Sequence, residues 1–303
     1  MERPPMIVTL AVSPSLDVTY EVDRLHPGEI TRPVRVTRVA GGKALNVARV
    51  ARSLGADVAA VGALGGHTGA WIADLLATDG VETRIVPLRH ETRTCSAIVE
   101  TDGGASSTDL YERATPLDAD EWEAFRATAL EAAASASGDV WVAFSGSVPA
   151  AVDPAEVAAL LAALRARGAR IAVDSSGAAL RALIQSADLV KVNRAEVEEL
   201  LEQRFADASE AAHALGSRWS VDVVVTDGVR GGSALLAGTR VDLPPPGALG
   251  RFSAGSGDAF LGGFLAAIDR GADPAQALAF AADAAERNAL VPGQGVLAER
   301  SPR

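Results

Sequence analysis

The sequence predicts an α/β protein, in which helices cover both faces of a mainly parallel β-sheet and a small second β-sheet forms a lid. From residue 118 onward, short apolar runs alternate regularly with amphipathic helical stretches, and this alternation is typical of a covered parallel sheet. Two pairs of strands, near 18–39 and 94–111, instead alternate apolar and polar residues and do not fit the parallel sheet. We therefore assign both pairs to the lid, although they lie far apart in the sequence.

The first third of the chain supplies strands of both kinds and two helices. A continuous apolar run indicates a buried strand, alternation indicates a half-exposed strand, and apolar residues at helical spacing before Gly55 indicate a helix. We therefore expect a buried strand at 6–12, half-exposed strands at 18–22 and 34–39, a helix at 43–54, a strand at 58–64, a helix at 68–78, and half-exposed strands at 94–100 and 107–111.

The remainder of the chain predicts the regular part of the fold. We expect helices at 118–137, 154–167, 178–185, 194–201, 209–219, 256–270 and 274–289. Strands are expected at 140–144, 171–174, 189–192 and 221–226, with a hairpin of 233–236 and 239–243 around Gly238. Because no repeat, low-complexity tract or long linker interrupts the pattern, the sequence predicts a single domain over 1–303, with a lid built from about 15–39 and 93–113.

Composition and charge argue against several classes of protein. The chain is 48% hydrophobic and 22% charged, which is ordinary for a globular protein and unlike a disordered chain. A net charge of −11 argues against partners such as nucleic acid or an anionic membrane surface, but a local cluster of cations would still bind a phosphorylated ligand. Neither a signal peptide nor a run of about 18 apolar residues is found, and the single Cys95 forbids an intrachain disulfide. These features predict a cytoplasmic protein.

Only two of the 28 basic residues are lysines, Lys43 and Lys191. In a chain that otherwise uses arginine, these are candidate positions for a compact ammonium group that arginine would not replace. The survival of two lysines by chance is the alternative interpretation.

The segment SAGSGD at 253–258 gives the strongest local signal of chemistry. Gly255 and Gly257, on either side of Ser256, let backbone N–H groups converge at the start of a helix, which makes an anion-binding pocket. Asp258 follows in the first turn, where a carboxylate can accept a proton from a nucleophile that attacks bound phosphorus. Loop glycines before an ordinary capped helix are the alternative. The segment matches neither a Walker A loop nor a dinucleotide-binding fingerprint.

The segment GGKALN at 41–46 is the second candidate. Gly41 and Gly42 permit close approach of the backbone to a ligand at another helix start. Lys43 and Asn46 lie three residues apart on one face of that helix, and they offer an ammonium and an amide to hydroxyl or phosphate groups. Taken alone, the segment is better explained as a turn followed by a helix.

Together, and in this order, the two segments resemble the two signatures of the PfkB family of carbohydrate kinases. The likeness runs nearly end to end, with further segments in the family's order at 13–17, 92–94, 145–149, 174–177, 191–193, 226–228 and 288–293. It is strongest for the hexose-phosphate branch, which includes 1-phosphofructokinase and tagatose-6-phosphate kinase. The resemblance implies a ribokinase-like three-layer αβα fold with a β-sheet lid.

The resemblance also implies a role for each matching residue in phosphoryl transfer from ATP to a sugar. Asp258 would be the base that activates a sugar hydroxyl, and the transferred phosphoryl group would be bound by Gly255, Ser256 and Gly257. The substrate side would be formed by Asp17, Gly41, Gly42, Lys43, Asn46 and Arg93. Lys43 and Arg93 would face a phosphate already present on the sugar, and Arg32, in the other lid segment, is a third candidate cation for that phosphate.

On the nucleotide side, the residues implied are Lys191, Asn193, Glu196, Thr226, Gly228, Gly231 and Asn288. Asn193 and Glu196 match an N-x-x-E motif that the family associates with Mg²⁺ and phosphate. We expect Mg²⁺ to arrive largely on ATP and expect no tightly held metal site made by protein side chains alone. The resemblance further implies a homodimer joined through the lids, whose amphipathic strands would otherwise expose an apolar face.

The chain departs from the family pattern mainly on the sugar side. Cys95 stands where the hexose-phosphate branch usually has Asn, and Tyr111 stands where a lid motif usually continues with Asn. The predicted activity is ATP-dependent phosphorylation of a phosphorylated hexose, namely fructose 1-phosphate, tagatose 6-phosphate or fructose 6-phosphate. A kinase of an unphosphorylated sugar or nucleoside is one alternative, and a sugar-phosphate binding protein without turnover is another.

Overall fold

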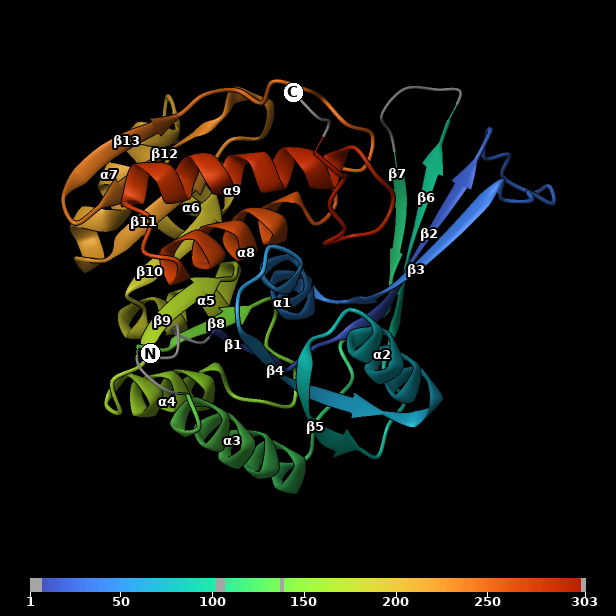
Figure 1. The fold of residues 1–303 in the computed structure, drawn as a ribbon, viewed down its shortest axis with the longest axis horizontal. Coiled ribbons are helices and arrows are strands. Elements are labelled where there is room, and N and C mark those ends of the chain that lie inside the picture. The colour runs from blue at the N-terminus through green and yellow to red at the C-terminus, as the bar shows by residue number, and fades with distance from the viewer. Residues whose placement is uncertain (1–6, 102–106, 137–138, 301–303) are drawn as a thin grey trace.

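A computed structural model describes residues 7–101, 107–136 and 139–300 and is drawn in Figure 1. The strands of its larger sheet are β1 (Ile7–Ala11), β4 (Val58–Gly65), β5 (Glu82–Leu88), β8 (Trp141–Ser145), β9 (Arg170–Asp174), β10 (Leu189–Asn193), β11 (Asp222–Thr226), β12 (Gly232–Leu236) and β13 (Thr239–Leu243). They pair in the order β13-β12-β11-β10-β9-β8-β1-β4-β5. From β11 to β5 the strands run parallel, and β12 and β13 add an antiparallel hairpin at one edge.

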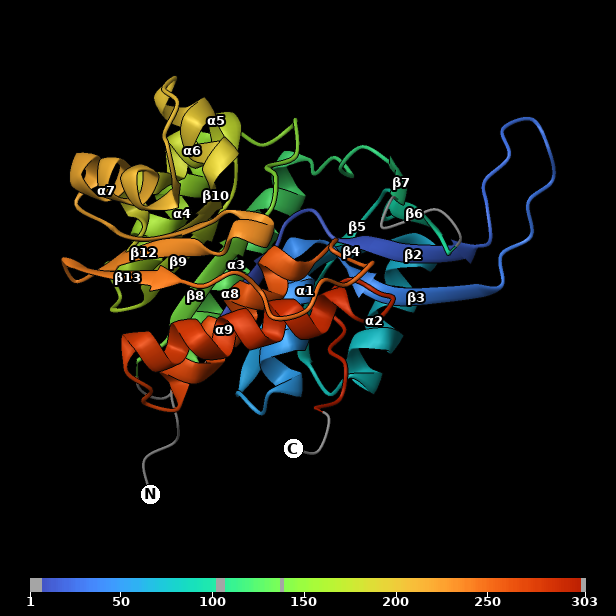
Figure 2. The ribbon, with the colours of Figure 1, turned by 90° about the horizontal axis from the view of Figure 1, so that it is seen from above.

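Helices cover both faces of this sheet, as Figure 2 shows from above. One face packs against α3 (Ala119–Ala134), α4 (Pro154–Arg165), α5 (Gly177–Leu183), α6 (Arg194–Leu201) and α7 (Ala208–Trp219). The other packs against α1 (Lys43–Ser53), α2 (Gly66–Thr78), α8 (Ser256–Asp269) and α9 (Pro274–Ala289). The predicted class and its helix-covered parallel sheet are thereby confirmed. Within the described residues, no helix is both long and apolar enough to cross a membrane.

Local sequence signals explain where several helices begin. Asp153 and Asp273 accept backbone N–H groups at the starts of α4 and α9, and each is followed by a proline at the first helical position. Asp118 and Glu121 form a reciprocal capping box at the start of α3. These caps satisfy donors that the helices themselves leave unpaired.

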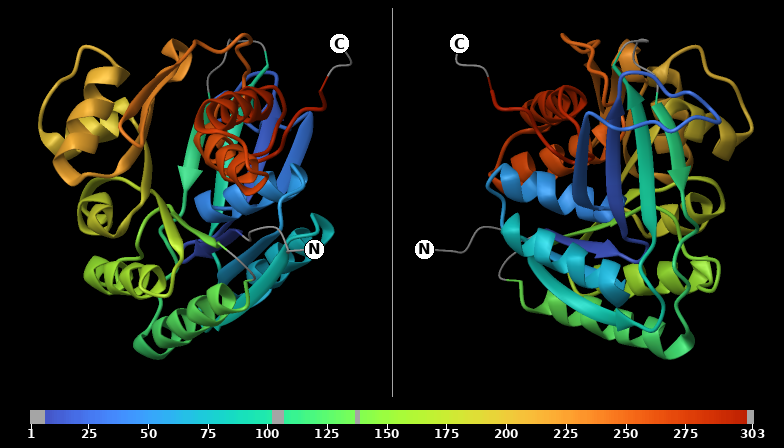
Figure 3. Two further views of the ribbon diagram at one scale, coloured as in Figure 1. Left: turned by 60° about the vertical axis from the view of Figure 1, so that its left-hand side comes forward. Right: turned by 90° about the vertical axis from the view of Figure 1, so that its right-hand side faces the viewer.

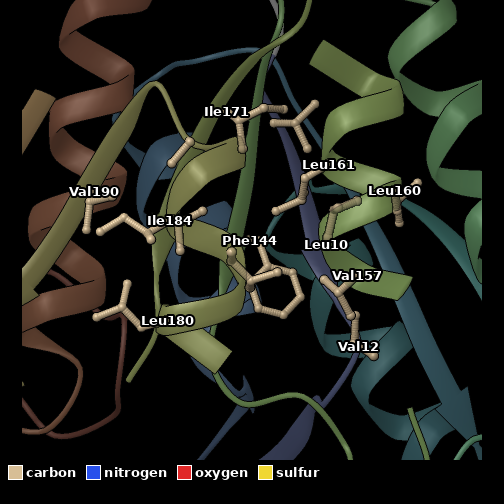
Figure 4. Close-up of a cluster of buried hydrophobic side chains, with 14 of the residues drawn as sticks. Leu10, Val12, Phe144, Val157, Leu160, Leu161, Ile171, Leu180, Ile184 and Val190 are labelled. Atoms are coloured by element: carbon tan, nitrogen blue, oxygen red, sulfur yellow. The ribbon is translucent and has the colours of Figure 1, made fainter. Parts of the chain in front are cut away.

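The residues of β1 divide the interior into two cores. Val8 and Leu10 pack into the core shared with α3 and α4, whereas Ile7 and Ala11 pack into the core shared with α1 and α8. Figure 4 shows part of the first core, where Leu10 lies near Phe144, and both side chains are at most 1% exposed. Each such burial contributes roughly 1.5–3 kcal/mol, so the strand ends that carry the site are held firmly from both faces.

The lid is a separate sheet made of β2 (Ser15–Val22), β3 (Arg35–Gly41), β6 (Thr94–Glu100) and β7 (Ser107–Tyr111), in the order β3-β2-β6-β7. It stands to one side of the larger sheet in Figure 1 and faces the viewer in the right panel of Figure 3. The two sequence-distant strand pairs join through the parallel pairing of β2 with β6. This confirms the predicted lid.

The structure adds one strand that the sequence pattern did not predict. β5 carries Glu82 and Arg84 as well as Pro87, and it forms the edge of the larger sheet beside β4. Charged residues and proline are tolerated at such an edge but hide the strand pattern. Met6 and Ser137, where one expected strand begins and one expected helix ends, lie outside the described residues.

Candidate active site

A cavity of about 1150 Å³ lies between the carboxyl ends of the parallel strands and the lid. Ser13 follows β1, Gly146 follows β8 and Ser175 follows β9, and all three line the cavity, as do Asn193 and Thr226 at the ends of β10 and β11. β1 lies between β4 and β8, where the strand order reverses direction. Ligands of open α/β sheets bind in the crevice at such a switch point.

Asp258 lies in the first turn of α8 and lines this cavity while only 5% exposed. Its Oδ2 accepts a hydrogen bond from Asn46 Nδ2 at 2.8 Å. Burial raises the pKa of Asp258 to about 7; the Lys43 ammonium opposes the rise and the Asp174 carboxylate adds to it. A carboxylate with this pKa is suited to accept a proton near neutral pH.

The helices α8 and α1 both begin at the cavity, and both lack a side-chain cap among the described residues. Gly255 and Gly42 occupy the N-cap positions with φ values of 82° and 88°, which favour glycine. Two N–H groups at these starts already have partners, since the Ser256 N–H donates to Ser253 O at 3.2 Å and the Gly42 N–H donates to Asp17 Oδ2 at 3.4 Å. The other N–H groups of the first turns point along the helix axis toward the cavity end, where an anion can bind. A Cβ on Gly257 would lie 2.5 Å from Lys191 Nζ, so glycine at this position lets an ammonium lie against the anion-binding loop.

Asp174, at the end of β9, joins the two lysines of the chain. Lys43 Nζ donates to its Oδ1 at 3.0 Å and Lys191 Nζ donates to its Oδ2 at 2.8 Å. Burial acts to raise the pKa of Asp174, but the ammonium groups of Lys191 and Lys43 outweigh it and lower the pKa to about 2. Asp174 raises the pKa of Lys43 in turn. An ionised Asp174 thus holds two cations close to Asp258.

Asp17 is the buried acid of the lid side of the cavity. Ser15 Oγ donates to its Oδ1 at 2.6 Å, and the Gly42 N–H donates to its Oδ2 at 3.4 Å. Burial raises the pKa of Asp17 to about 6, although these two hydrogen bonds oppose the rise. A Cβ on Gly41 would collide with the Asp17 carboxylate, so the first glycine of the pair makes room for a side chain.

A row of side chains crosses the lid beside Asp17. Strand pairing aligns Asp17 with Cys95 and Cys95 with Tyr111, and all three line the cavity. Tyr111 Oη accepts a hydrogen bond from Gln294 Nε2 at 3.4 Å, which links the lid to the segment after α9. Cys95 and Tyr111, two positions at which the sequence departs from the family pattern, therefore lie next to each other on the lid side of the cavity.

Arg93 lies where the lid meets the larger domain and also lines the cavity. Its guanidinium donates to the carbonyl oxygens of Ser13 at 3.1 Å, Pro14 at 3.3 Å and Glu112 at 3.0 Å. A guanidinium has five N–H donors, so these three bonds leave two donors unused among the residues that the structure describes.

The predicted nucleotide residues meet at the other end of the cavity, which Asn193, Glu196, Thr226, Gly228 and Gly231 all line. The N-x-x-E motif forms a capping box at the start of α6. Asn193 Oδ1 accepts the Glu196 N–H at 2.9 Å, and Glu196 Oε2 accepts the Asn193 N–H at 2.8 Å. The loop at 244–250 and the face of α9 near Glu286 complete this end.

Four predicted site residues lie outside the cavity lining of the described residues: Gly41, which makes room for the Asp17 carboxylate, and Asn46, Asn288 and Arg32. Asn46 is fully buried behind Asp258, to which it donates, so it contacts the candidate base and not the open cavity. Asn288 is fully buried as well, and it donates to Ala254 O at 3.0 Å and accepts from the Gly295 N–H at 2.8 Å. Arg32 is exposed in the connection from β2 to β3, which reaches away from the rest of the molecule in Figure 2.

The sequence analysis assigned no role to Asp174, which pairs with two lysines that line the cavity, or to Gln294, which lines the cavity itself. Asp174 ends a buried strand and is the counter-ion of both lysines, a role that the lysine count indicates but does not assign. Gln294 follows a glycine in an irregular segment, where no periodic pattern indicates its direction.

A parallel sheet between helix layers, a β-sheet lid and an uncapped helix start beside a buried acid define a ribokinase-like kinase. The chain belongs to the pfkB family of carbohydrate kinases, whose family model matches residues 10–299. The crystal structure of phosphofructokinase-2 from Escherichia coli in complex with potassium superposes with a TM-score of 0.87 at 25% identity, over 98% of this chain and 96% of that one.

The same Escherichia coli enzyme is similar to this chain in two other states. Its complex with fructose-6-phosphate gives a TM-score of 0.84 at 26% identity, over 94% of this chain and 93% of that one. Its tetrameric inhibited form gives a TM-score of 0.85 at 26% identity, over 95% of this chain and 94% of that one. The chain is thus a sugar kinase, a phosphotransferase with an alcohol group as acceptor.

Proposed function

We propose that this sugar kinase transfers the γ-phosphoryl group of ATP to a hydroxyl of a phosphorylated hexose. The observation that carries the proposal is the placement of Asp258, a buried carboxylate with a pKa raised to about 7, in the first turn of an uncapped helix between the lid and the nucleotide end. The candidate acceptors are fructose 1-phosphate, tagatose 6-phosphate and fructose 6-phosphate.

Asp258 acts as the general base in this proposal. It takes the proton of the acceptor hydroxyl while the oxygen forms a bond to the γ-phosphorus and the bond from that phosphorus to the β-phosphate oxygen breaks. ADP departs with the electron pair of the broken bond. The hydrogen bond from Asn46 fixes the direction of the carboxylate, so we assign Asn46 to positioning the base and not to holding the sugar directly.

The charge of the transferred group is balanced by the start of α8 and by Lys191. Gly255, Ser256 and Gly257 offer backbone N–H groups, and the Lys191 ammonium lies against Gly257. The donor set also fits Mg²⁺ that arrives bound to ATP, because Asn193 and Glu196 offer oxygen atoms at the cavity. The described residues contain no group of three or more His, Cys, Asp or Glu side chains able to hold a metal ion. Mg²⁺ would neutralise the phosphate charges of the nucleotide.

The sugar occupies the lid end, with Asp17 accepting its hydroxyl groups. The Lys43 ammonium and the two Arg93 donors that the described residues leave unused bind the phosphate that the sugar already carries. The lid excludes water that would otherwise hydrolyse ATP. The fructose-6-phosphate complex of the Escherichia coli relative supports a phosphorylated acceptor.

The tetrameric form of the Escherichia coli relative supports self-association of this chain, which we propose occurs as a homodimer through the lids. We also propose that residues 1–303 act as one kinase domain.

An ADP-release screen tests the proposed function. The purified chain is assayed with ATP and Mg²⁺ against fructose 1-phosphate, fructose 6-phosphate, tagatose 6-phosphate, free hexoses and nucleosides. We expect the highest kcat/KM with one of the three sugar phosphates. A higher kcat/KM for a free sugar or a nucleoside would show that the acceptor is not phosphorylated. If none of the acceptors causes ADP release, a binding protein without turnover would be favoured.

A further inference from the structure

The start of α6 and the turn at 228–231 border the nucleotide end of the cavity, and they follow neighbouring strands. Asn193, the last residue of β10, pairs in register with Thr226, the last residue of β11. The next residues are Arg194, the first residue of α6, and Asp227, which precedes the turn. Arg194 Nε donates to Asp227 Oδ2 at 3.1 Å. An ion pair therefore links the start of α6 to the turn.

Arg194 also ties the start of α6 to the interior of that helix. Its Nη1 donates to Glu198 Oε1 at 2.7 Å and to Phe205 O at 3.0 Å. The side chains of Arg194, Asp227 and Glu198 are 23%, 11% and 7% exposed, so the bridge from Asp227 through Arg194 to Glu198 is largely shielded from water. Shielded pairs are screened by salt much less than surface pairs.

Asp227 also stabilises the conformation of the turn at 228–231. Its carboxylate accepts from Arg230 Nε at 2.8 Å and from Arg230 Nη2 at 2.7 Å, and its own N–H donates to Gly231 O at 2.7 Å. The residues that this turn presents to the cavity include Gly228 and Gly231. A shift of Asp227 would therefore move the wall against which the nucleotide binds.

We propose that Arg194 is a positioning residue for the nucleotide: by bridging Asp227 and Glu198, it sets the turn at 228–231 relative to the start of α6 and so fixes the width of the nucleotide end. This inference rests on the proposed binding of ATP at that end. Arg194, Asp227 and Glu198 are outside the lining of the cavity as far as the structure describes it, so each acts through neighbours that line it.

The chain offers a matched control for this proposal. Arg204 also donates to Glu198, at 2.7 Å, but its side chain is 92% exposed and, within the described parts of the chain, it forms no hydrogen bond to Asp227 or to the turn. We therefore compare Arg194→Gln and Arg194→Lys with Arg204→Gln. The lysine variant keeps the charge but lacks the planar fork that reaches both acids at once.

Isothermal titration of ADP into each variant, without turnover, gives the first measurement, and steady-state KM values for ATP and for the sugar substrate give the second. Arg194→Gln should weaken ADP binding and raise the KM for ATP by roughly 3- to 30-fold, with kcat and the KM for sugar little changed. Arg194→Lys should fall between wild type and Arg194→Gln, and Arg204→Gln should match wild type.

Equal ADP affinity in wild type and Arg194→Gln would overturn the proposal, as would equal losses for the sugar and the nucleotide or an equal loss in Arg204→Gln. A wild-type protein that binds no ADP would instead overturn the proposed function. If Arg194→Gln does not fold, Asp227→Asn provides the same comparison: it keeps the size of the side chain, weakens the bridge, and should raise the ADP dissociation constant in the same direction.

Discussion

Replacing Asp258 by Asn should abolish most turnover and at the same time stabilise the fold. A general base contributes roughly 10²- to 10⁴-fold to the rate, so we expect kcat to fall within that range while ATP binding is retained. The amide keeps the size of the side chain, and its oxygen can still accept the hydrogen bond that Asn46 Nδ2 now donates at 2.8 Å.

The stabilisation follows from the direction of the pKa shift. Burial raises the pKa of Asp258 from 3.8 to about 7 in the folded state, so ionised Asp258 lowers stability progressively as the pH rises through this window. The full shift corresponds to at most about 4 kcal/mol above pH 7. At roughly 2–4 °C per kcal/mol, each kcal/mol of this cost that the variant removes should raise its Tm at pH 8 by a few degrees. The gain should shrink as the pH falls toward 4.

Differential scanning calorimetry at several pH values, together with an ADP-release assay, measures both effects. Asp269, at the other end of α8, supplies the control: burial raises its pKa to about 6 as well, and the neighbouring Asp57 adds to the rise. Asp269→Asn should therefore raise Tm at pH 8 without loss of turnover. Near-normal turnover of Asp258→Asn would refute the role as base, and a Tm that falls at pH 8 would refute the electrostatic argument.

Three further predictions concern the substrate phosphate, the lysine pair and assembly. Arg93→Ala should raise the KM for the sugar phosphate by an amount worth roughly 1.5–3 kcal/mol, the range for hydrogen bonds to charged groups, and leave the KM for ATP nearly constant; steady-state kinetics that show no change for the sugar phosphate would exclude this role. Asp174→Asn should lower the free energy of unfolding by up to about 3–5 kcal/mol, because the buried Lys191 loses its counter-ion; a urea midpoint equal to that of wild type would contradict the pairing. Sedimentation velocity at micromolar concentrations should show a homodimer, and a fully active monomer would exclude assembly through the lids.

Much of the fold can be predicted from the periodicity of hydrophobic residues, and the elements that cannot be predicted in this way have local causes. The strands of the sheet interior are continuous apolar runs because helices bury both faces, and their pattern is clear in the sequence. β5 was not predicted because it lacks a clear strand pattern. As an edge strand it tolerates the charges of Glu82 and Arg84 and the proline at position 87. The two lid strand pairs could be placed together from the sequence because both are amphipathic and neither fits the parallel sheet. The structure joins them by pairing β2 with β6.

The site is predictable where a motif fixes the backbone and less so where side chains reach across the fold. Glycines at helix starts place Gly255 and Asp258 correctly at the cavity. The direction of Asn46 depends on Asp258, 212 residues away, and no local pattern shows that it turns toward the base. The bridge of Asp174 to two lysines is similarly non-local. The contact of Arg32 with the substrate stays a prediction, and Arg32 is not among the described residues that line the cavity.

The pairing of both lysines with one acid has a consequence for chemical labelling. The chain carries side-chain amines at positions 43 and 191 alone, and both positions line the cavity. A succinimidyl ester or an acetylating agent therefore finds its side-chain amines only where ATP and sugar are proposed to meet. Amine coupling of this protein to a dye or a surface would proceed through the terminal amine or at the cost of the cavity. Because Asp174 raises the pKa of Lys43, this amine stays protonated and reacts slowly with such reagents even without a ligand, so the terminal amine should react first.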